Sequence, residues 1–264
     1  MLIDFHTHCF PDKIAERAIE KLQFVSGGLT PYTDGTVSGL QRSMKNNGVD
    51  SAVVLSIATN AKQQANVNDF AASINNGHDI IAFGSVFPDA PDALDELDRI
   101  KSMGLKGVKL HPDYQGFNAD DPKMKPIYKK ISSLGLITVF HAGADYGFPP
   151  PYGATPEKLE TAIGWFDSPV IAAHWGGIDC YKGVLDRLCG LDNLYFDTSF
   201  GYSMMPGYYA EKIIEKQGTE HMVFGTDTPW HTAEMEWRLL DTLNLSDSER
   251  EAISYKNAQK LLGI

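Results

Sequence analysis

Eight short apolar runs, rich in β-branched residues, recur along the chain, and longer stretches with helical periodicity separate them. Each run has the length of a β-strand. The predicted strands cover residues 2–8, 50–57, 80–86, 105–111, 136–142, 169–175, 193–199 and 221–227. This pattern predicts a protein in which strands and helices alternate from end to end.

The stretches between the runs carry helix signals, with a cap or a proline near the first turn and a glycine at the end. Ser133-Leu-Gly135 and Met103-Gly104 are endings of this kind. A capping box from Ser246 to Glu249 opens the last helix. The predicted helices cover residues 12–23, 36–47, 60–76, 92–103, 123–134, 156–166, 181–189, 205–216, 233–243 and 247–262.

Eight strand–helix units in 264 residues predict a (β/α)₈ TIM barrel of the α/β class. A doubly wound sheet usually has fewer strands and a glycine-rich first turn, and no such motif is present. We find no linker or repeat, so we expect residues 1–264 to form a single domain. The irregular stretch 143–155 is predicted to be a loop over the mouth of the barrel, where this fold places its active site.

Composition narrows the possible partners. The chain is 43% hydrophobic and 22% charged, which is typical of a globular protein. A net charge of −11 without any basic run argues against nucleic acid or an anionic membrane as a partner. No apolar stretch reaches the roughly 20 residues that span a bilayer, and three cysteines form no paired framework. We therefore expect a cytoplasmic protein with free thiols and a small-molecule substrate.

Side chains that bind metals gather at the predicted strand ends. His6 and His8 share one face of the first strand, and Asp4 lies on that face one step deeper. Four later strand ends supply further side chains of this kind: His111, His141, His174 and Asp227. The other histidines, His78, His221 and His231, lie elsewhere in this prediction. Imidazole and carboxylate groups at one rim of a barrel predict a bound divalent metal.

These residues resemble the amidohydrolase superfamily. The early His6-Thr-His8, the later His141 and His174, and Asp227 after the last strand are typical of that superfamily. More narrowly, four segments resemble its amidohydrolase-related branch: DFHTH at 4–8, KLHP at 109–112, AHWGG at 173–177 and FGTDTP at 224–229. That branch includes uncharacterised metal-dependent hydrolases and the aminocarboxymuconate semialdehyde decarboxylase group.

The resemblance implies that one metal ion is held by His6, His8, His141 and Asp227, with a water completing its shell. Zinc suits these donors best, and manganese or iron(II) also fits them. His174 would then lie beside that water and handle its proton, and Asp227 would both bind the metal and move protons.

Two residues of the fourth strand keep several interpretations open. Lys109 could be a carboxylated lysine that bridges two metal ions, a binder of a substrate carboxylate, or the partner of an inward carboxylate such as Asp4. His111 could contact substrate, bind a second metal, or be a hydrogen-bonded rim histidine. The number of metal ions is therefore one or two.

Aromatic side chains follow several strands. They could wall a pocket for a flat substrate, or pack the loops on one another. Cys9 turns away from the metal face and is expected to be a structural thiol. Asp197 and Ser199 share a face of the seventh strand and are expected to bond to neighbouring rim groups. The loop side chains that we predict to bind substrate are Tyr114, Tyr146 and Tyr202.

The leading hypothesis is a metal-dependent hydrolase of a small molecule, with a metal-activated water attacking the carbonyl carbon of an amide, ester or lactone. The alternative is non-oxidative decarboxylation of an unsaturated or aromatic carboxylic acid. That reaction needs a cation near the metal to orient the substrate carboxylate. All six arginines fall on predicted helices, so Lys109 and His111 are the residues that could take this part.

Two further classes of protein fit the sequence less well. A phosphoesterase that opens with a histidine pair would need a late Asp-x-His, which Asp227-Thr-Pro229 does not supply. A catalytically inactive metal-binding barrel would have no need of His174. A homodimer is expected from base rates alone.

Overall fold

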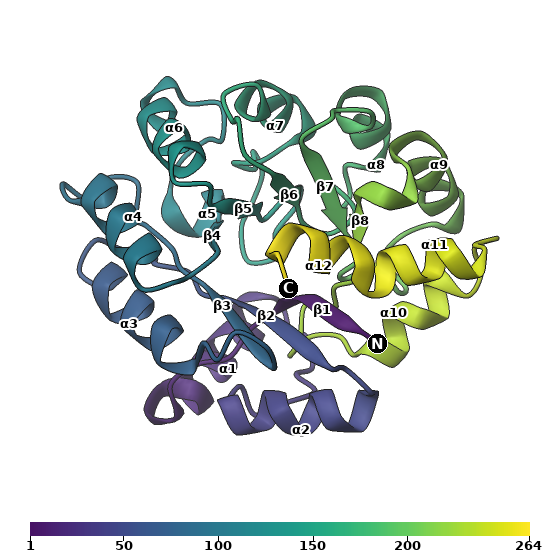
Figure 1. Ribbon diagram of the computed structural model, residues 1–264, viewed down its shortest axis with the longest axis horizontal. Coiled ribbons are helices and arrows are strands. Elements are labelled where there is room, and N and C mark those ends of the chain that lie inside the picture. Colours follow the sequence, from purple (N-terminus) through teal and green to yellow (C-terminus); the bar gives the residue numbers. More distant parts are fainter.

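The structure is a computed structural model that describes residues 1–264. Its strands form a ring with helices around it (Figure 1). The strands are β1 (Ile3–Thr7), β2 (Ser51–Leu55), β3 (Ile80–Phe83), β4 (Gly107–Leu110), β5 (Ile137–Phe140), β6 (Val170–Ala172), β7 (Leu194–Asp197) and β8 (Met222–Val223). All neighbouring strands pair in parallel, in the orders β1-β2-β3 and β4-β5-β6-β7-β8.

Backbone hydrogen bonds close the two seams between these groups of strands. Between β3 and β4, the Gly84 N–H donates to Gly107 O at 2.9 Å, and the Lys109 N–H donates to Gly84 O at 2.8 Å. Between β8 and β1, the Phe5 N–H donates to Phe224 O at 2.7 Å, and the Asp227 N–H donates to His6 O at 2.8 Å. The eight strands therefore form a closed ring, and the predicted TIM barrel is confirmed.

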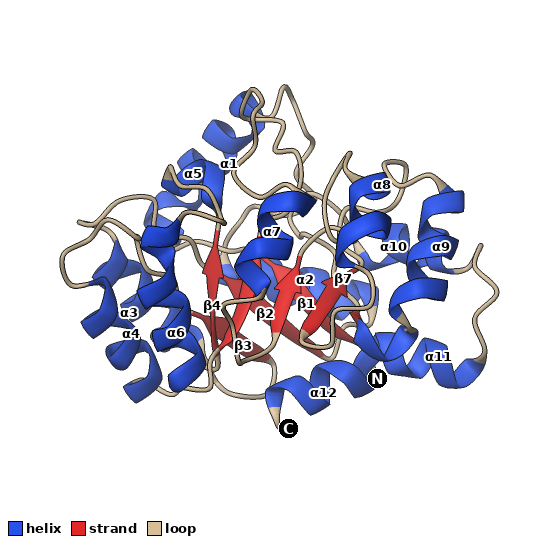
Figure 2. Ribbon diagram, turned by 90° about the horizontal axis from the view of Figure 1, so that it is seen from above, coloured by secondary structure: helices blue, strands red, loops and turns tan.

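Helices cover the outside of the ring. They are α1 (Asp12–Val25), α2 (Val37–Asn47), α3 (Gln64–Ile74), α4 (Ala93–Ser102), α5 (Pro112–Gln115), α6 (Lys125–Ser133), α7 (Pro156–Ile163), α8 (Tyr181–Gly183), α9 (Gly207–Gln217), α10 (Ala233–Leu240), α11 (Asp247–Glu251) and α12 (Asn257–Leu262). The strand arrows point towards the end of the barrel where α1 and α5 lie, while α11, α12 and both chain ends lie at the opposite end (Figure 2).

Several element boundaries differ from the sequence prediction. The strands are shorter: β4, β5, β6 and β8 end before the polar residues assigned to their ends, whereas β1 contains His6 and β7 ends at Asp197. The predicted helix 247–262 is divided by a π-helical segment, Ala252–Lys256, and another, Val184–Leu188, follows α8. The short helix α5 was not predicted. The capping box at Ser246 and Glu249 is present.

Two apolar layers position the site. The inner group takes residues from every strand except β4, together with Ala258 and Leu262 of α12, so α12 closes the end of the barrel away from the strand tips. The outer group packs strands against helices. On β4, Gly107 leaves room for neighbours, because a Cβ there would lie 2.3 Å from the Phe83 ring. The inward position of β4 in this layer is instead taken by Lys109, which is buried.

No helix has both the length and the apolar character needed to cross a bilayer. The three cysteines are free, as expected. Cys9 is buried, and burial raises the pKa of its thiol to about 12. These observations agree with Cys9 being a structural thiol rather than a nucleophile.

Candidate metal and active site

The predicted site residues all lie at the end of the barrel to which the strands point. His6 is in β1, and His8 is the first residue after it. Two histidines directly follow their strands: His111 after β4 and His141 after β5. His174 and Asp227 lie in the segments that follow β6 and β8. The structure therefore brings the six predicted side chains to one mouth.

Three of them form a compact group, which we call the His6–His8–Asp227 group. The Nε2 atoms of His6 and His8 lie 3.3 Å and 3.0 Å from Asp227 Oδ1. Their ligand atoms all lie within 4.8 Å of one another. His141, the fourth predicted ligand, falls outside this group.

His141 instead meets His174 at the same mouth. The Nδ1 atom of His141 lies 3.2 Å from Nε2 of His174. The ring of His174 lies beside that of His6, with the ring centres 4.9 Å apart. The two sets of side chains are therefore neighbours, and His174 joins them.

Hydrogen bonds fix which nitrogen of His6 and His8 carries a proton. His6 donates from Nδ1 to Asp197 Oδ2 at 2.8 Å, and His8 donates from Nδ1 to Leu55 O at 2.8 Å. In the neutral form of each ring, Nε2 then keeps a bare lone pair that faces the carboxylate of Asp227. A shared cation makes such a contact favourable.

The same reasoning applies to the His141–His174 pair. His141 donates from Nε2 to Ala144 O at 3.1 Å, so its Nδ1 is bare. Ser199 donates its single hydroxyl proton to Asp197 at 2.5 Å, and it accepts from His174 Nδ1 at 2.8 Å. His174 Nε2 is then bare as well, and two lone pairs face each other across 3.2 Å. This contact also calls for a cation or a proton.

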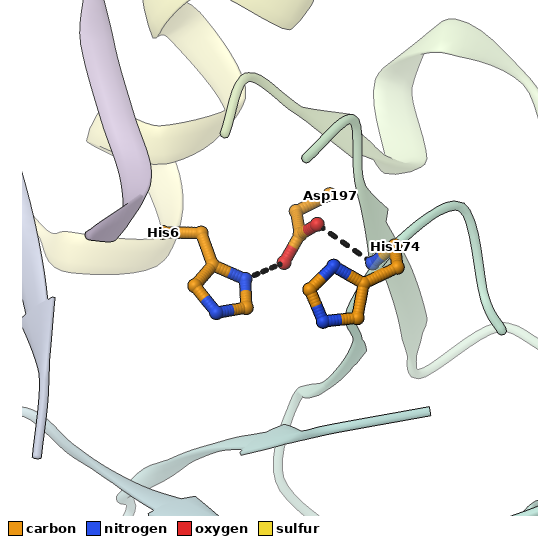
Figure 3. A group of neighbouring side chains, drawn as sticks. All are labelled: His6, His174 and Asp197. Carbon is orange, nitrogen blue, oxygen red and sulfur yellow. Dashed lines mark hydrogen bonds and ion pairs between the residues drawn. The ribbon is translucent and has the colours of Figure 1, made fainter. Parts of the chain in front are cut away.

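Asp197 is the anchor of this arrangement. Figure 3 shows its carboxylate between His6 and His174, with one oxygen accepting from the His6 ring and the other from the His174 backbone N–H at 2.8 Å. It also accepts from the Ser199 N–H at 3.1 Å. The expectation that Asp197 and Ser199 bond to rim groups is confirmed, and both act as positioning residues.

Burial keeps four of these histidines neutral. It lowers the pKa of His6, His111 and His174 well below the usual value, and that of His141 to about 3. A neutral imidazole with a bare nitrogen is the form that binds metal ions. The donors, their protonation and their convergence thus fit a divalent metal.

Lys109 lies at the floor of this mouth. Its Nζ is 3.3 Å from Nε2 of His6, and no carboxylate oxygen lies within 4.0 Å of it. Burial lowers the pKa of Lys109 to about 8, while the charges of Asp197 and Asp227 act in the other direction.

The suggested ion pair between Lys109 and Asp4 is absent. Asp4 instead accepts hydrogen bonds from Thr226 N at 3.0 Å and from Thr226 Oγ1 at 2.6 Å. The strand register shifts between Asp4 and Thr7, so strict alternation fails there. Two adjacent residues of β1 therefore both face the interior: Phe5 belongs to the inner apolar group, and His6 bonds to the buried carboxylate of Asp197.

His111 pairs with a residue that the sequence did not single out. Its Nε2 lies 3.1 Å from Asp145 Oδ2, and its ring stacks on that of His141 with the centres 4.1 Å apart. Asp145 also accepts from the Gly147 N–H at 2.7 Å. This pair fastens the 143–155 loop to the end of β4. The ligand atoms of His111, His141 and Asp145 also lie within 4.8 Å of one another.

The three predicted substrate-binding tyrosines have different surroundings. Tyr114 packs edge-on against His111 and Phe148, with ring centres 4.7 Å and 4.8 Å away. Tyr146 is 40% exposed. The ring of Tyr202 faces the Arg238 guanidinium at 5.7 Å. It is not one of the rings that pack around His111 and Tyr114.

His231 corrects the sequence prediction, which placed it away from the rim. Its ring stacks on Phe200 with centres 4.4 Å apart, and Phe200 in turn lies edge-on to His174 at 6.2 Å. Its Nδ1 lies 2.5 Å from Glu236 Oε1, and the other Glu236 oxygen accepts from the Gly201 N–H at 2.9 Å. No recognised sequence motif signals this pair, although its members are local: His231 lies just before α10 and Glu236 lies within it.

The fold and this set of side chains are those of the metal-dependent TIM-barrel enzymes. The chain matches the family described as Amidohydrolase over residues 3–264, so it belongs to that family and is an enzyme. The resemblance drawn from the sequence motifs is thereby confirmed.

Solved structures with the same fold include a 5-carboxyvanillate decarboxylase from Sphingomonas paucimobilis, at 19% identity and a TM-score of 0.72, covering 100% of this chain and 99% of that one. A dihydroxybenzoic acid decarboxylase from Polaromonas sp. JS666, with bound manganese and the inhibitor 2-nitroresorcinol, has 14% identity and a TM-score of 0.73, covering 99% and 96%. An uncharacterised TIM-barrel protein from Bordetella bronchiseptica has 18% identity and a TM-score of 0.78, covering 99% and 98%.

Proposed function

We propose that the protein is a metal-dependent hydrolase that cleaves an amide, ester or lactone of a small molecule. The observation that carries this proposal is the set of bare imidazole nitrogens facing one another and Asp227 at the barrel mouth. A bound divalent ion supplies a water of lowered pKa and polarises a carbonyl group. His6, His8, His141 and Asp227 are the proposed ligands.

The other residues of the mouth handle protons and hold the ligands in place. Asp227 and His174 take a proton from the attacking water and return it to the leaving group. Ser199 and Asp197 fix the ring of His174 through its Nδ1 and its backbone N–H. His174 therefore presents its bare Nε2 towards the site, which suits a group that accepts a proton.

Zinc is the metal that we place first, because three imidazoles and one carboxylate suit its preference for nitrogen and oxygen donors. Manganese or iron(II) fits the same donors. A cytoplasmic location and a homodimer remain predictions from the sequence.

The walls of the mouth favour a flat, apolar substrate. Phe200 lies against His174, and Tyr114 lies against His111 and Phe148. Ala144, Ile178 and Phe200 form a small apolar cluster above the site. Aromatic edges and faces of this kind bind rings through dispersion and stacking.

Decarboxylation is a second candidate, and one observation favours it. Lys109 gives the mouth a buried cation that no carboxylate of the chain pairs with, so a substrate carboxylate could lie there. All six arginines lie on outer helices or π-helical segments and cannot take this part. Solved structures with this fold include several that are decarboxylases by name.

A substrate panel separates the two candidates. Lactones, aryl esters, cyclic amides and aromatic or unsaturated carboxylic acids are assayed with zinc- or manganese-loaded enzyme and with a chelated control. The proposal expects metal-dependent hydrolysis of at least one neutral or singly charged carbonyl compound. Release of carbon dioxide from the acids, with no hydrolysis of the other compounds, would replace hydrolysis with decarboxylation.

A further inference from the structure

A buried glutamate of α10 lies behind the mouth and has no part in the proposed reaction. Glu236 is 1% exposed, and the other buried residues of this helix are apolar: Ala233, Leu239 and Leu240. Burial raises the pKa of Glu236 to about 6, so the carboxylate still predominates at neutral pH. A buried carboxylate costs free energy that an apolar side chain would not, so its purpose lies in the bonds that it makes.

Both oxygens of Glu236 are bonded, and one of them holds the turn that follows β7. Oε2 accepts from the Gly201 N–H at 2.9 Å and from the Tyr202 N–H at 3.2 Å. Oε1 accepts from Nδ1 of His231 at 2.5 Å. The two backbone groups directly follow Phe200, whose φ of +58° is unfavourable for a residue other than glycine. The carboxylate therefore stabilises a backbone conformation that is costly by itself.

The turn is closely packed between two side chains. On one side is Glu236, and on the other Trp175 donates from Nε1 to Thr198 O at 2.9 Å. A Cβ at Gly201 would lie 2.4 Å from Trp175 Nε1 and 3.1 Å from Glu236 Oε2. In an interior packed this closely, a shift of one side chain is passed to its neighbours. A change at Glu236 should therefore displace the turn.

The same turn holds His174 in two ways. Ser199 Oγ accepts from Nδ1 of His174 at 2.8 Å, and Phe200 lies edge-on to the His174 ring with the centres 6.2 Å apart. His231 stacks on Phe200, with the ring centres 4.4 Å apart and the planes at 17°. A path of direct contacts thus runs from Glu236 and His231 through the turn to His174.

We propose that Glu236 and His231 are positioning residues for His174. They fix the turn of residues 199–202, which keeps the proton of His174 on Nδ1 and leaves its Nε2 able to accept a proton. This role rests on the proposed function, in which His174 handles protons. Neither side chain bonds to a proposed metal ligand, so zinc affinity should not depend on them.

Glu236→Gln tests this role with little change of volume. An amide has one accepting oxygen and one donating nitrogen, so it cannot accept at both of the positions that the carboxylate oxygens occupy. The control is Glu234→Gln, the same substitution at an exposed position of α10 that pairs with Arg238. His231→Phe is the second variant, because it keeps a ring against Phe200 and removes the donor to Glu236.

NMR of ¹⁵N-labelled imidazoles in the zinc-loaded protein shows which nitrogen of His174 carries the proton. The spectrum of His174→Asn identifies the signals. In the wild type and in Glu234→Gln, Nδ1 should be protonated and Nε2 bare. In Glu236→Gln and His231→Phe, the two signals should shift towards each other, because the ring exchanges between its tautomers, while zinc affinity stays the same. Unchanged His174 signals in both variants would overturn the proposal.

A double-mutant cycle on turnover tests the same path. Glu236→Gln should lower turnover of the panel substrate by about 10-fold or more, since small displacements of a reacting group are costly to the rate. In a His174→Asn background the same substitution should have almost no effect, because the group that Glu236 positions is gone. Equal losses in both backgrounds would make Glu236 an ordinary structural residue and would also overturn the proposal.

These readouts separate the positioning role from the proposed function. If no panel compound is hydrolysed, the function fails, while the NMR signals of His174 still decide the positioning role. If hydrolysis is found and Glu236→Gln behaves as the wild type in both readouts, only the positioning role is lost.

Discussion

At the residue scale, the site depends on where each histidine keeps its proton. Each of four histidines donates one ring N–H to an acceptor of the protein. The acceptors are Asp197 for His6, Leu55 O for His8, Ala144 O for His141 and Ser199 Oγ for His174. The second nitrogen of each ring is left bare towards the mouth. Acceptors that fix the tautomer and the ring orientation in this way raise the affinity of a metal site.

Asp197→Asn tests this role of Asp197 directly. The amide cannot supply the negative charge that holds the Nδ1–H of His6 and the hydroxyl of Ser199. We expect zinc affinity to fall by about 10- to 100-fold, measured by competition with a chromophoric chelator. Asp192→Asn, at an exposed position of the preceding loop, is the control and should bind zinc normally. Equal affinity in both variants would remove Asp197 from the site.

His174→Asn tests the division of labour between ligands and proton-handling groups. We expect metal binding to stay nearly intact while turnover of the panel substrate falls by roughly 10²-fold or more, the usual size of a general acid–base contribution. Asp227→Asn should impair both metal binding and turnover. Equal metal loss in the two variants would make His174 an ordinary ligand, and unchanged turnover in His174→Asn would exclude it from the mechanism.

The sequence could predict which residues reach the mouth, but not how they bond there. His6, His111, His141 and Asp227 were found because strand ends can be recognised and parallel strands end on one side. The partner of His6 could not be found this way, since Asp197 is 191 residues away and meets it only when the barrel closes. Asp145 lies in an irregular loop, whose path the apolar pattern does not determine.

At the scale of elements, the loop after β5 is fixed by a close backbone contact. Gly143 has φ +79°, and a Cβ there would lie 2.3 Å from backbone atoms of Ile178. The Ile178 N–H donates to Ala142 O, and the Ala144 N–H donates to Ile178 O at 2.9 Å. This contact fixes the position of the Ala144 carbonyl, which accepts the hydrogen bond from His141 Nε2. The left-handed backbone and the close packing at Gly143 therefore serve the site.

Gly143→Ala should be much more damaging than Gly104→Ala. Both glycines have φ +79°, but nothing lies within 4 Å of a Cβ at Gly104. Gly104→Ala should lose about 1–2 kcal/mol of unfolding free energy from its left-handed backbone. Gly143→Ala should lose roughly 1–3 kcal/mol more from overpacking, and should also weaken zinc binding. Urea unfolding curves and zinc titrations of both variants measure these losses; equal losses would contradict the backbone contact.

Element boundaries were predicted less well than element order. The apolar runs gave all eight strands in sequence, because buried strands of a parallel barrel are nearly continuous in apolar residues. The strands end earlier because the chain turns at the rim, where His174 and Asp227 have φ +59° and +66°. The short helix α5 was missed because Pro112–Gln115 spans a single turn and has no periodicity to detect.

At the scale of the molecule, the site exists only when the ring of strands is closed. His6 of β1 contacts two carboxylates from distant parts of the chain. Asp227 comes from the segment after β8, and Asp197 is the last residue of β7. The β8–β1 seam is held by backbone bonds at Phe5 and Asp227. Binding of a metal to this closed form should stabilise the whole barrel, because only the native state brings the ligands together.

The most direct test of the account is therefore the metal itself. The protein is purified without chelator, its metal content is measured by elemental analysis, and its thermal unfolding is followed before and after metal removal. We predict at least one zinc, manganese or iron ion per chain, a lower unfolding temperature after removal, and recovery when zinc or manganese is added back. A protein that carries no transition metal and gains no thermal stability from either ion would contradict the account.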